Sequence, residues 1–147
     1  MDIVSRIEEL SFFLRRFAPR IVLRVGPDFV EASSREGRVQ ATPFLIVIRQ
    51  GNRPIVAGIG DDPVTSSDAV RVPVFSGVPA GGSAEHDDLV ESFITTILAR
   101  LPKSGGVIRP VVVVDNLSSL EAPLLGRQRE LIARALTRWG AAAVVIG

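Results

Sequence analysis

Cysteine is absent from this sequence, and histidine occurs only once. The absence of cysteine excludes disulfide bonds and zinc sites built on thiolates. A formal net charge of +1 provides no strong field that would attract nucleic acid. No apolar run reaches the roughly 18 residues that a membrane-spanning helix needs, and Glu8 and Glu9 interrupt the apolar part that a secretory signal would need. We therefore expect a cytoplasmic protein that does not bind nucleic acid.

What the sequence does contain is enough apolar material for one globular domain. The chain has 147 residues, of which 46% are hydrophobic and 22% are charged. These values are typical of proteins that bury a full core. We divide the chain into an N-terminal amphipathic helix in residues 1–20 and a single domain in residues 21–147.

The C-terminal third shows the clearest pattern, which is a β-α-β unit. Four consecutive valines precede Asp115, and branched side chains in a continuous apolar run predict a strand covered on both faces. A helix is predicted over residues 122–139, with Gly140 as its C-terminal cap, followed by a strand over residues 142–146. A strand, a helix and a second strand in this order predict parallel pairing of the two strands.

The first half of the domain is predicted to be antiparallel. Strands are expected at residues 21–25, 29–33, 44–48 and 54–59, separated by turn residues such as those at 26–28. Residues 61–82 are interpreted as an extended connection, within which residues 71–75 are either paired or packed on the core. The next helix begins at Ser83 and has a broad apolar face, formed by Leu89, Val90, Phe93, Ile94, Ile97, Leu98 and Leu101.

Two surfaces are candidates for contacts with partners. Residues 3–17 fit an amphipathic helix that Pro19 ends, with an apolar face formed by Ile3, Ile7, Leu10, Phe13, Leu14 and Phe17. Phe12 falls on the polar side, where a large aromatic group is unusual for a free surface. The last predicted helix carries Arg127, Arg134 and Arg138 on one side, which is either a solvated face or a surface for an acidic partner.

The order of these elements resembles the first subdomain of the bacterial actin homologue MreB, which has the actin-like (ribonuclease-H-like) fold. Residues 37–50 are similar to that family's turn, proline and third strand, with Pro43 at the proline position. Residues 55–61, 71–78 and 111–146 are similar to its following segment, its connection and its final strand, helix and strand. The resemblance implies an α/β fold with a five-stranded mixed sheet, antiparallel in its first half and parallel in its second, flanked by helices.

The same resemblance implies a phosphate-binding loop at the first hairpin, where the family has Asp-x-Gly-Thr. The residues at these positions are Arg24, Val25, Gly26 and Pro27. Arginine supplies no oxygen ligand for magnesium, and proline lacks a backbone N–H for a phosphate. The second half of the actin-like fold would follow Gly147. We therefore expect no catalytic residues, no metal and no bound cofactor.

The resulting interpretation is a non-catalytic, degenerate actin-like domain that acts through protein contacts. The partner would be a second copy or a component of cell-shape or filament machinery, and Phe12 and the edge strand near Phe29 are the surfaces to probe. One alternative is a nucleotide-binding half-site completed by another chain, and another is a peripheral membrane adaptor. The resemblance also implies that a distant C-terminal helix covers one face of the sheet, so residues 3–17 are expected either to replace that helix or to bind a membrane or a partner.

Several other residues have ordinary explanations. Asp115 fits a turn or a helix entry, and His86 fits a solvated position near a helix start. Gly58 and Gly60 lack the third glycine of a dinucleotide-binding loop. The serines at positions 118 and 119 fit a helix cap, because neither a second histidine nor a G-x-S-x-G elbow accompanies them.

Overall fold

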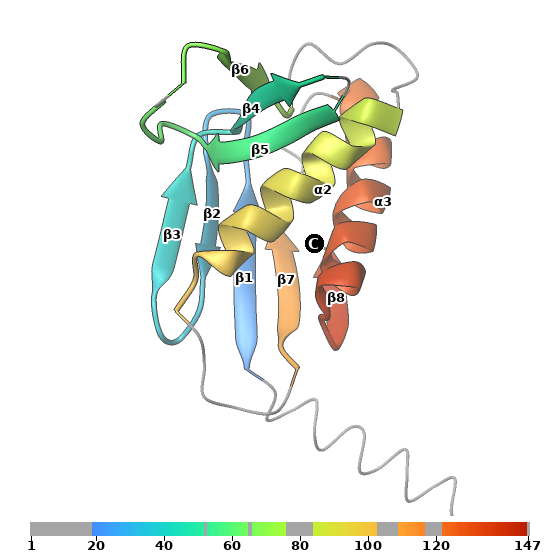
Figure 1. Cartoon of the computed structure of the whole chain (residues 1–147). Helices are drawn as coiled ribbons and strands as arrows, with labels where there is room; N and C mark the ends of the chain where they lie inside the picture. Colours follow the sequence, from blue (N-terminus) through green and yellow to red (C-terminus); the bar gives the residue numbers. More distant parts are fainter. Residues whose placement is uncertain are drawn as a thin grey trace, which may run out of the picture.

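The computed structural model describes residues 19–51, 53–64, 66–75, 84–102, 109–116 and 122–146. Its larger sheet has five strands in the order β3-β2-β1-β7-β8 (Figure 1). Their bounds are β1 (Arg20–Val25), β2 (Val30–Ser33), β3 (Arg38–Ala41), β7 (Val111–Asp115) and β8 (Ala143–Ile146). β1 pairs antiparallel with β2, whereas β1 with β7 and β7 with β8 are parallel. The predicted mixed sheet and its division into antiparallel and parallel halves are confirmed.

A second sheet of three strands follows β3 and was not predicted. It contains β4 (Phe44–Gln50), β5 (Arg53–Ile59) and β6 (Ala69–Pro73) in the order β5-β4-β6. Residues 44–48 form a strand as predicted, but it belongs to the smaller sheet, because β3 takes the place beside β2. The expectation that the strand near Phe29 is an edge strand is wrong for the same reason, since β2 lies between β3 and β1. Pro43 lies between β3 and β4, and proline donates no ladder hydrogen bond, so the chain changes sheet at this point.

The expected extended connection contains the third strand of this smaller sheet. β6 pairs antiparallel with β4, with Leu45 opposite Val72. The two residues that follow β6, Val74 and Phe75, are buried in the hydrophobic core. Both alternatives considered for residues 71–75 are therefore realised, since residues 71–73 are paired and residues 74 and 75 are packed.

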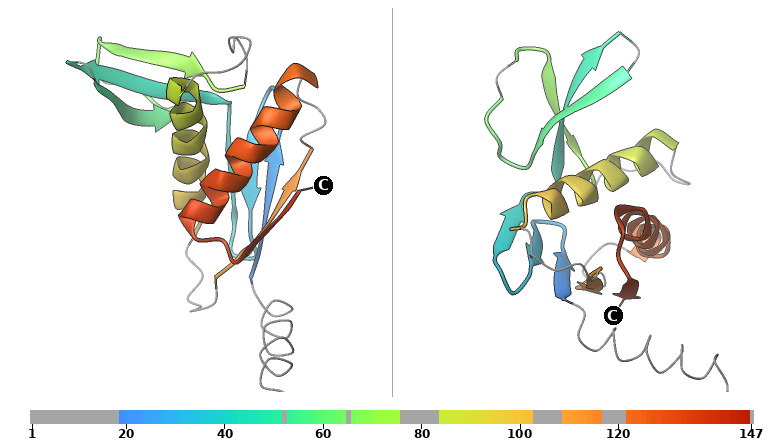
Figure 2. Two further views of the ribbon diagram at one scale, coloured as in Figure 1. Left: turned by 90° about the vertical axis from the view of Figure 1, so that its right-hand side faces the viewer. Right: turned by 60° about the horizontal axis from the view of Figure 1, so that its bottom comes forward.

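Two helices, α2 (Ala84–Ala99) and α3 (Ala122–Trp139), lie on one face of the five-stranded sheet (Figure 2). The predicted apolar face of α2 is buried from Val90 to Leu101, and Phe93 meets Phe75 edge to face with ring centroids 6.3 Å apart. In α3, Ile132, Ala135 and Leu136 are buried. Full burial of one apolar side chain contributes about 1.5–3 kcal/mol, so this layer accounts for much of the stability.

Gly140 ends α3 in the way that the sequence predicts. Its φ is 114°, a conformation that L-residues with side chains rarely adopt. Its N–H donates to the carbonyls of Leu136 and Thr137 at 3.2 and 3.1 Å, and the N–H of Ala141 also donates to Leu136. These bonds satisfy carbonyls that would otherwise be left open at the helix end, and they turn the chain toward β8.

Residues 1–18 lie outside the described residues, and so does the predicted N-terminal helix. Neither described helix combines the length and the apolar character needed to cross a membrane.

Candidate functional site

The first candidate site is the edge of the sheet at which the parallel strands β1 and β7 end. Ligands of α/β sheets commonly bind at the carboxyl ends of such strands. Arg24 lies next to the end of β1, and its register partners are Glu31 on β2 and Asp115 on β7. The Arg24 side chain is exposed. A guanidinium between two acidic neighbours binds an anion more weakly than an isolated guanidinium does, because the acids offset its positive charge.

The turn that follows β1 is a tight hairpin with few free donors. The N–H of Gly26 donates to the carbonyl of Phe29 at 3.0 Å, and Pro27 has no N–H to offer. Phosphate loops hold their ligand with several backbone N–H groups that point at the anion. Two of the four residues of this turn therefore contribute no backbone N–H donor to an anion.

Asp115 lies at the exposed end of β7. Its Oδ1 accepts a hydrogen bond from the N–H of Asn116 at 2.9 Å, and Asn116 has a φ of 66°. Asparagine tolerates this left-handed conformation, and aspartate commonly bonds to nearby backbone at chain reversals. The geometry is that of a turn residue, as the sequence suggests. Positions 118 and 119 lie outside the described residues.

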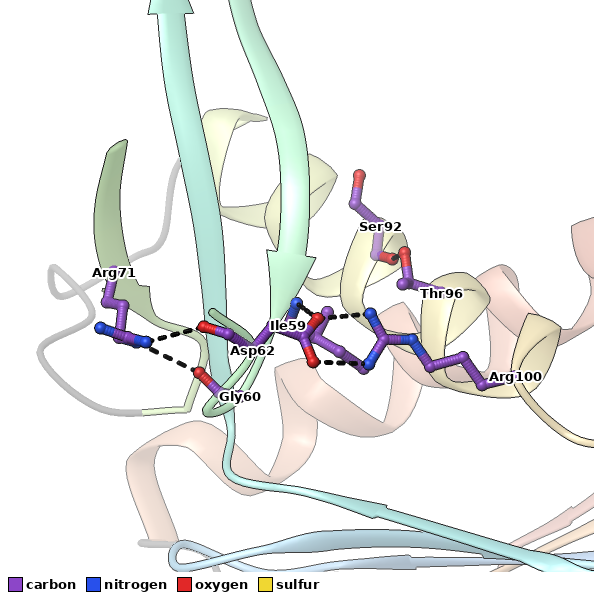
Figure 3. A network of polar contacts seen from close by, with 7 residues as sticks. All are labelled: Ile59, Gly60, Asp62, Arg71, Ser92, Thr96 and Arg100. Carbon is purple, nitrogen blue, oxygen red and sulfur yellow. Dashed lines mark hydrogen bonds and ion pairs between the residues drawn. The ribbon is translucent and has the colours of Figure 1, made fainter. Parts of the chain in front are cut away.

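The most connected polar group in the described chain is Asp62, which sequence analysis did not single out (Figure 3). Its carboxylate accepts two hydrogen bonds from Arg100, one of them from Nη1 at 2.9 Å, and a third from the N–H of Ile59 at 2.9 Å. Arg71 donates from the other side to the carbonyls of Gly60 and Asp62, at 3.3 and 2.9 Å. We call Asp62, Arg71 and Arg100 the Asp62 cluster.

The contacts of the Asp62 cluster are typical of a group that holds the fold together. The two bonds from Arg100 hold the pKa of Asp62 below its usual value despite the opposing effect of burial, and the Ile59 N–H adds to the lowering. The same pairing raises the pKa of Arg100. Each strong donor in the cluster is already directed at a protein oxygen. The cluster therefore joins the three-stranded sheet to the end of α2 and leaves little capacity for a ligand.

The same cluster explains the two glycines that superficially resemble a dinucleotide-binding loop. A Cβ on Gly58 would lie 2.7 Å from Oδ2 of Asp62. Gly60 has a φ of 60°, and a Cβ there would lie 3.1 Å from the backbone nitrogen of Thr42. Both positions need glycine for close packing inside the protein, so their spacing does not indicate a cofactor site.

The candidate arginines of α3 lie on an exposed side of the helix. Arg134 and Arg138 are both exposed. Arg138 bridges to the neighbouring helix, because its Nη1 donates to Oε2 of Glu91 at 2.9 Å. The side chains of Arg127 and His86 lie outside the described part of the chain, and so do Leu10, Phe12, Leu14 and Phe17.

The three-stranded sheet exposes more large apolar side chains than sequence analysis indicated. Val70 on β6 is 61% exposed, Ile55 and Val56 on β5 are 46% and 39% exposed, and Phe44 on β4 is 36% exposed. Val56 and Val70 are both register partners of Val47 and therefore share one face of the sheet, whereas Ile55 and Phe44 lie on the other face. We call Val56 and Val70 the apolar patch of the small sheet. Clusters of exposed apolar side chains on a soluble protein commonly mark a contact surface. The sequence shows a run of apolar residues on each side of Gly51. Which of these residues share an exposed face follows only from the pairing of the strands.

Comparisons with known proteins agree with this geometry. No protein-family model and no curated protein matches the sequence. MreB5 of Spiroplasma citri bound to ADP is similar in structure, with a TM-score of 0.60 and 19% identity over 89% of this chain and 38% of that chain. A non-polymerising mutant of MamK bound to AMPPNP has a TM-score of 0.60 and 14% identity, over 88% of this chain and 40% of its own.

The chain therefore has a partial actin-like fold, as the resemblance seen in the sequence implied. The match covers 38% of the MreB5 chain and 40% of the MamK chain, so this chain spans about two fifths of their length.

Proposed function

We propose that this chain is a non-catalytic, degenerate actin-like domain that acts through protein–protein contacts. The main support is the hairpin after β1, where Arg24 replaces the expected acid, Gly26 uses its N–H within the turn and Pro27 has none. An ATPase needs oxygen ligands for magnesium and free donors for phosphate. The comparison structures hold ADP and AMPPNP, but this hairpin offers neither feature.

The partner in this proposal is a second copy of the chain or another actin-like protein of cell-shape or filament machinery. The MamK structure is that of a non-polymerising mutant, so assembly is a property of that relative. The apolar patch of the small sheet supports contact here, because Val70 and Val56 are 61% and 39% exposed on the two edge strands and share one face. Apolar side chains in such positions are stabilised when a partner removes them from water.

The proposal predicts assembly that does not depend on nucleotide. Sedimentation velocity over a hundredfold range of concentration should show a shift to larger species, equal with and without Mg·ATP. Val70→Asp and Val56→Asp should abolish the shift and leave the circular dichroism spectrum unchanged. Val64→Asp is the matched control, because Val64 is 41% exposed but lies in the connection between β5 and β6. A wild-type chain that stays monomeric alone and with an actin-like protein would refute the proposal.

The second candidate is a nucleotide-binding half-site completed by another chain. The observation that favours it is Asp115, an exposed carboxylate beside Arg24 at the carboxyl end of β7. A ligand that binds only the folded complex must raise its melting temperature. Mg·ATP should then stabilise the chain mixed with its partner and leave the isolated chain unchanged, whereas the first proposal predicts no effect on either.

A further inference from the structure

The five-stranded sheet has an outer face, which is the face opposite α2 and α3 (Figure 2). Alternation along the strands identifies the residues on it. Leu23 and Val112 are buried in the core under the helices, so their chain neighbours Val22 and Val113 point the other way. On β8, Val144 packs on the core, and Val145 therefore also points outward.

These outward residues form one continuous apolar row. Val22 is the register partner of Val113, and Val113 is the register partner of Val145. We call these three residues the valine row. Val145 is 51% exposed, although parallel strands normally carry a covering layer on both faces. The β2 and β3 half of the same face is polar, since it presents Glu31, Ser33, Arg38 and Gln40. The apolar area thus matches the width of one helix rather than a whole sheet.

We propose that residues 3–17 of the same chain form a helix that lies on the valine row. The segment ends immediately before β1, the strand that carries Val22, with only residues 18 and 19 between them. Connections of this length are common between a helix and a strand that pack together. The helix would run antiparallel to β1, as such a short connection requires.

The dimensions of the two elements agree. A helix rises about 1.5 Å per residue, so Leu14 and Leu10 lie about 5 and 11 Å along the helix from Phe17. A strand rises about 3.3 Å per residue, so the valine row lies about 7 Å along β1 from Arg20. The row therefore falls between Leu14 and Leu10, on the apolar face that also carries Ile3 and Ile7.

The charges of the segment favour this site over a lipid surface. Helices that bind anionic membranes carry mainly Lys and Arg on the polar face. The segment carries Glu8 and Glu9 together with Arg6, Arg15 and Arg16, so its charges are of mixed sign and attraction to anionic lipid is weakened. A helix that covers a sheet inside the protein does not need a basic polar face. This inference is independent of the proposed function, because a covering helix serves any activity of the domain.

The absence of native cysteine allows a direct test with engineered disulfides in the full chain. Leu14→Cys combined with Val113→Cys should form an intramolecular disulfide under mild oxidation, at least about tenfold faster than Phe12→Cys combined with Val113→Cys. Phe12 is the matched control, because it lies on the opposite side of the predicted helix, out of reach of a bond that requires Cα atoms within about 7 Å. The rate should not depend on protein concentration.

Equal rates for the two pairs would overturn the proposal, and so would a disulfide that forms between chains. A second measurement does not rely on cysteine. Leu10→Asp combined with Leu14→Asp should lower the melting temperature by at least about 5 °C, since removal of a covering layer exposes apolar surface. An unchanged melting temperature together with lost flotation on vesicles of anionic lipid would show that the segment binds membranes instead. The sedimentation experiment on the small sheet remains interpretable in either case.

Discussion

The carboxylate of Asp62 and the guanidinium of Arg100 form a bidentate ion pair between residues that are 38 positions apart in the sequence. Asp62 follows β5, and Arg100 lies in the turn that ends α2. The pair fixes the position of the three-stranded sheet relative to the helix layer. It also engages the Asp62 carboxylate in a structural contact, which leaves that carboxylate little capacity to bind a ligand.

The Asp62–Arg100 pair predicts a specific dependence of stability on pH. The bonds from Arg100 are the main reason that the pKa of Asp62 is lowered. A group whose pKa is lower in the folded state stabilises the fold above its unfolded pKa, and this stabilisation is lost as the pH falls through the folded pKa. Arg100→Ala should therefore reduce the free energy of unfolding by about 1 kcal/mol at pH 7, with a difference that shrinks below about pH 4.

Urea denaturation followed by circular dichroism at pH 7, 5 and 3 measures this difference. Arg134→Ala is the control, because Arg134 is exposed on α3 and its loss should change stability by less than about 0.5 kcal/mol at each pH. A deficit for Arg100→Ala that stays constant down to pH 3 would mean that the arginine contributes packing rather than charge pairing.

Two glycines with similar backbone angles should respond differently to substitution. Gly60 and Gly51 have φ values of 60° and 65°, so alanine is strained at both. A Cβ on Gly60 would also crowd Ala41 and Thr42 at 3.1 Å, whereas nothing lies within 4 Å of one on Gly51. Gly60→Ala should cost about 2–3 kcal/mol of unfolding free energy and Gly51→Ala about 1 kcal/mol. Equal losses in urea denaturation would contradict the close approach at the junction of the sheets.

Much of the fold was predictable because its strongest elements carry local signals. β7 and β8 are apolar runs, and the apolar face of α2 has helical spacing from Val90 to Leu98. β3 was missed because Arg38–Ala41 has only four residues, half of them polar, and gains its stability from pairing with β2. A short strand of this kind has no periodicity long enough to distinguish it from a turn.

Of the candidate site, only the features of the hairpin after β1 could be predicted from the sequence. The replacement of the expected acid by Arg24 and the absence of an N–H at Pro27 can be deduced from residue types alone. The Asp62 cluster could not be deduced, because its three residues come from separate elements. In the sequence each is a charged residue of the kind that is usually exposed to solvent. The burial of Gln128 in α3 was missed for a related reason, since a polar residue interrupts the apolar pattern that identifies a core face.

The aromatic contact between Phe75 and Phe93 should anchor the chain after β6. Phe75 is buried and packs edge to face on Phe93, so Phe75→Ala should cost about 3–5 kcal/mol of unfolding free energy. Phe44→Ala is a matched control, because Phe44 lies on β4 and is 36% exposed, and its cost should be about 1 kcal/mol. Urea denaturation of both variants measures the difference, and a smaller loss for Phe75→Ala would contradict the packing described for this segment.

Restoring an acid at position 24 should not create a nucleotide site. Arg24→Asp supplies a carboxylate for magnesium, but Gly26 still donates its N–H to Phe29 and Pro27 still lacks one. We expect no heat of binding when Mg·ATP is titrated into this variant at millimolar concentration. Binding gained by Arg24→Asp alone would show that the charge at this position, and not the hairpin, excludes the ligand.

The most direct test of the account is isothermal titration calorimetry of the unmodified chain with Mg·ATP and Mg·ADP. If the domain is a degenerate actin-like domain, we expect no saturable binding up to millimolar nucleotide. The hairpin after β1 lacks the acidic oxygen ligand for magnesium and the free N–H donors for the phosphates. Saturable binding with a micromolar Kd, dependent on magnesium, would contradict the account.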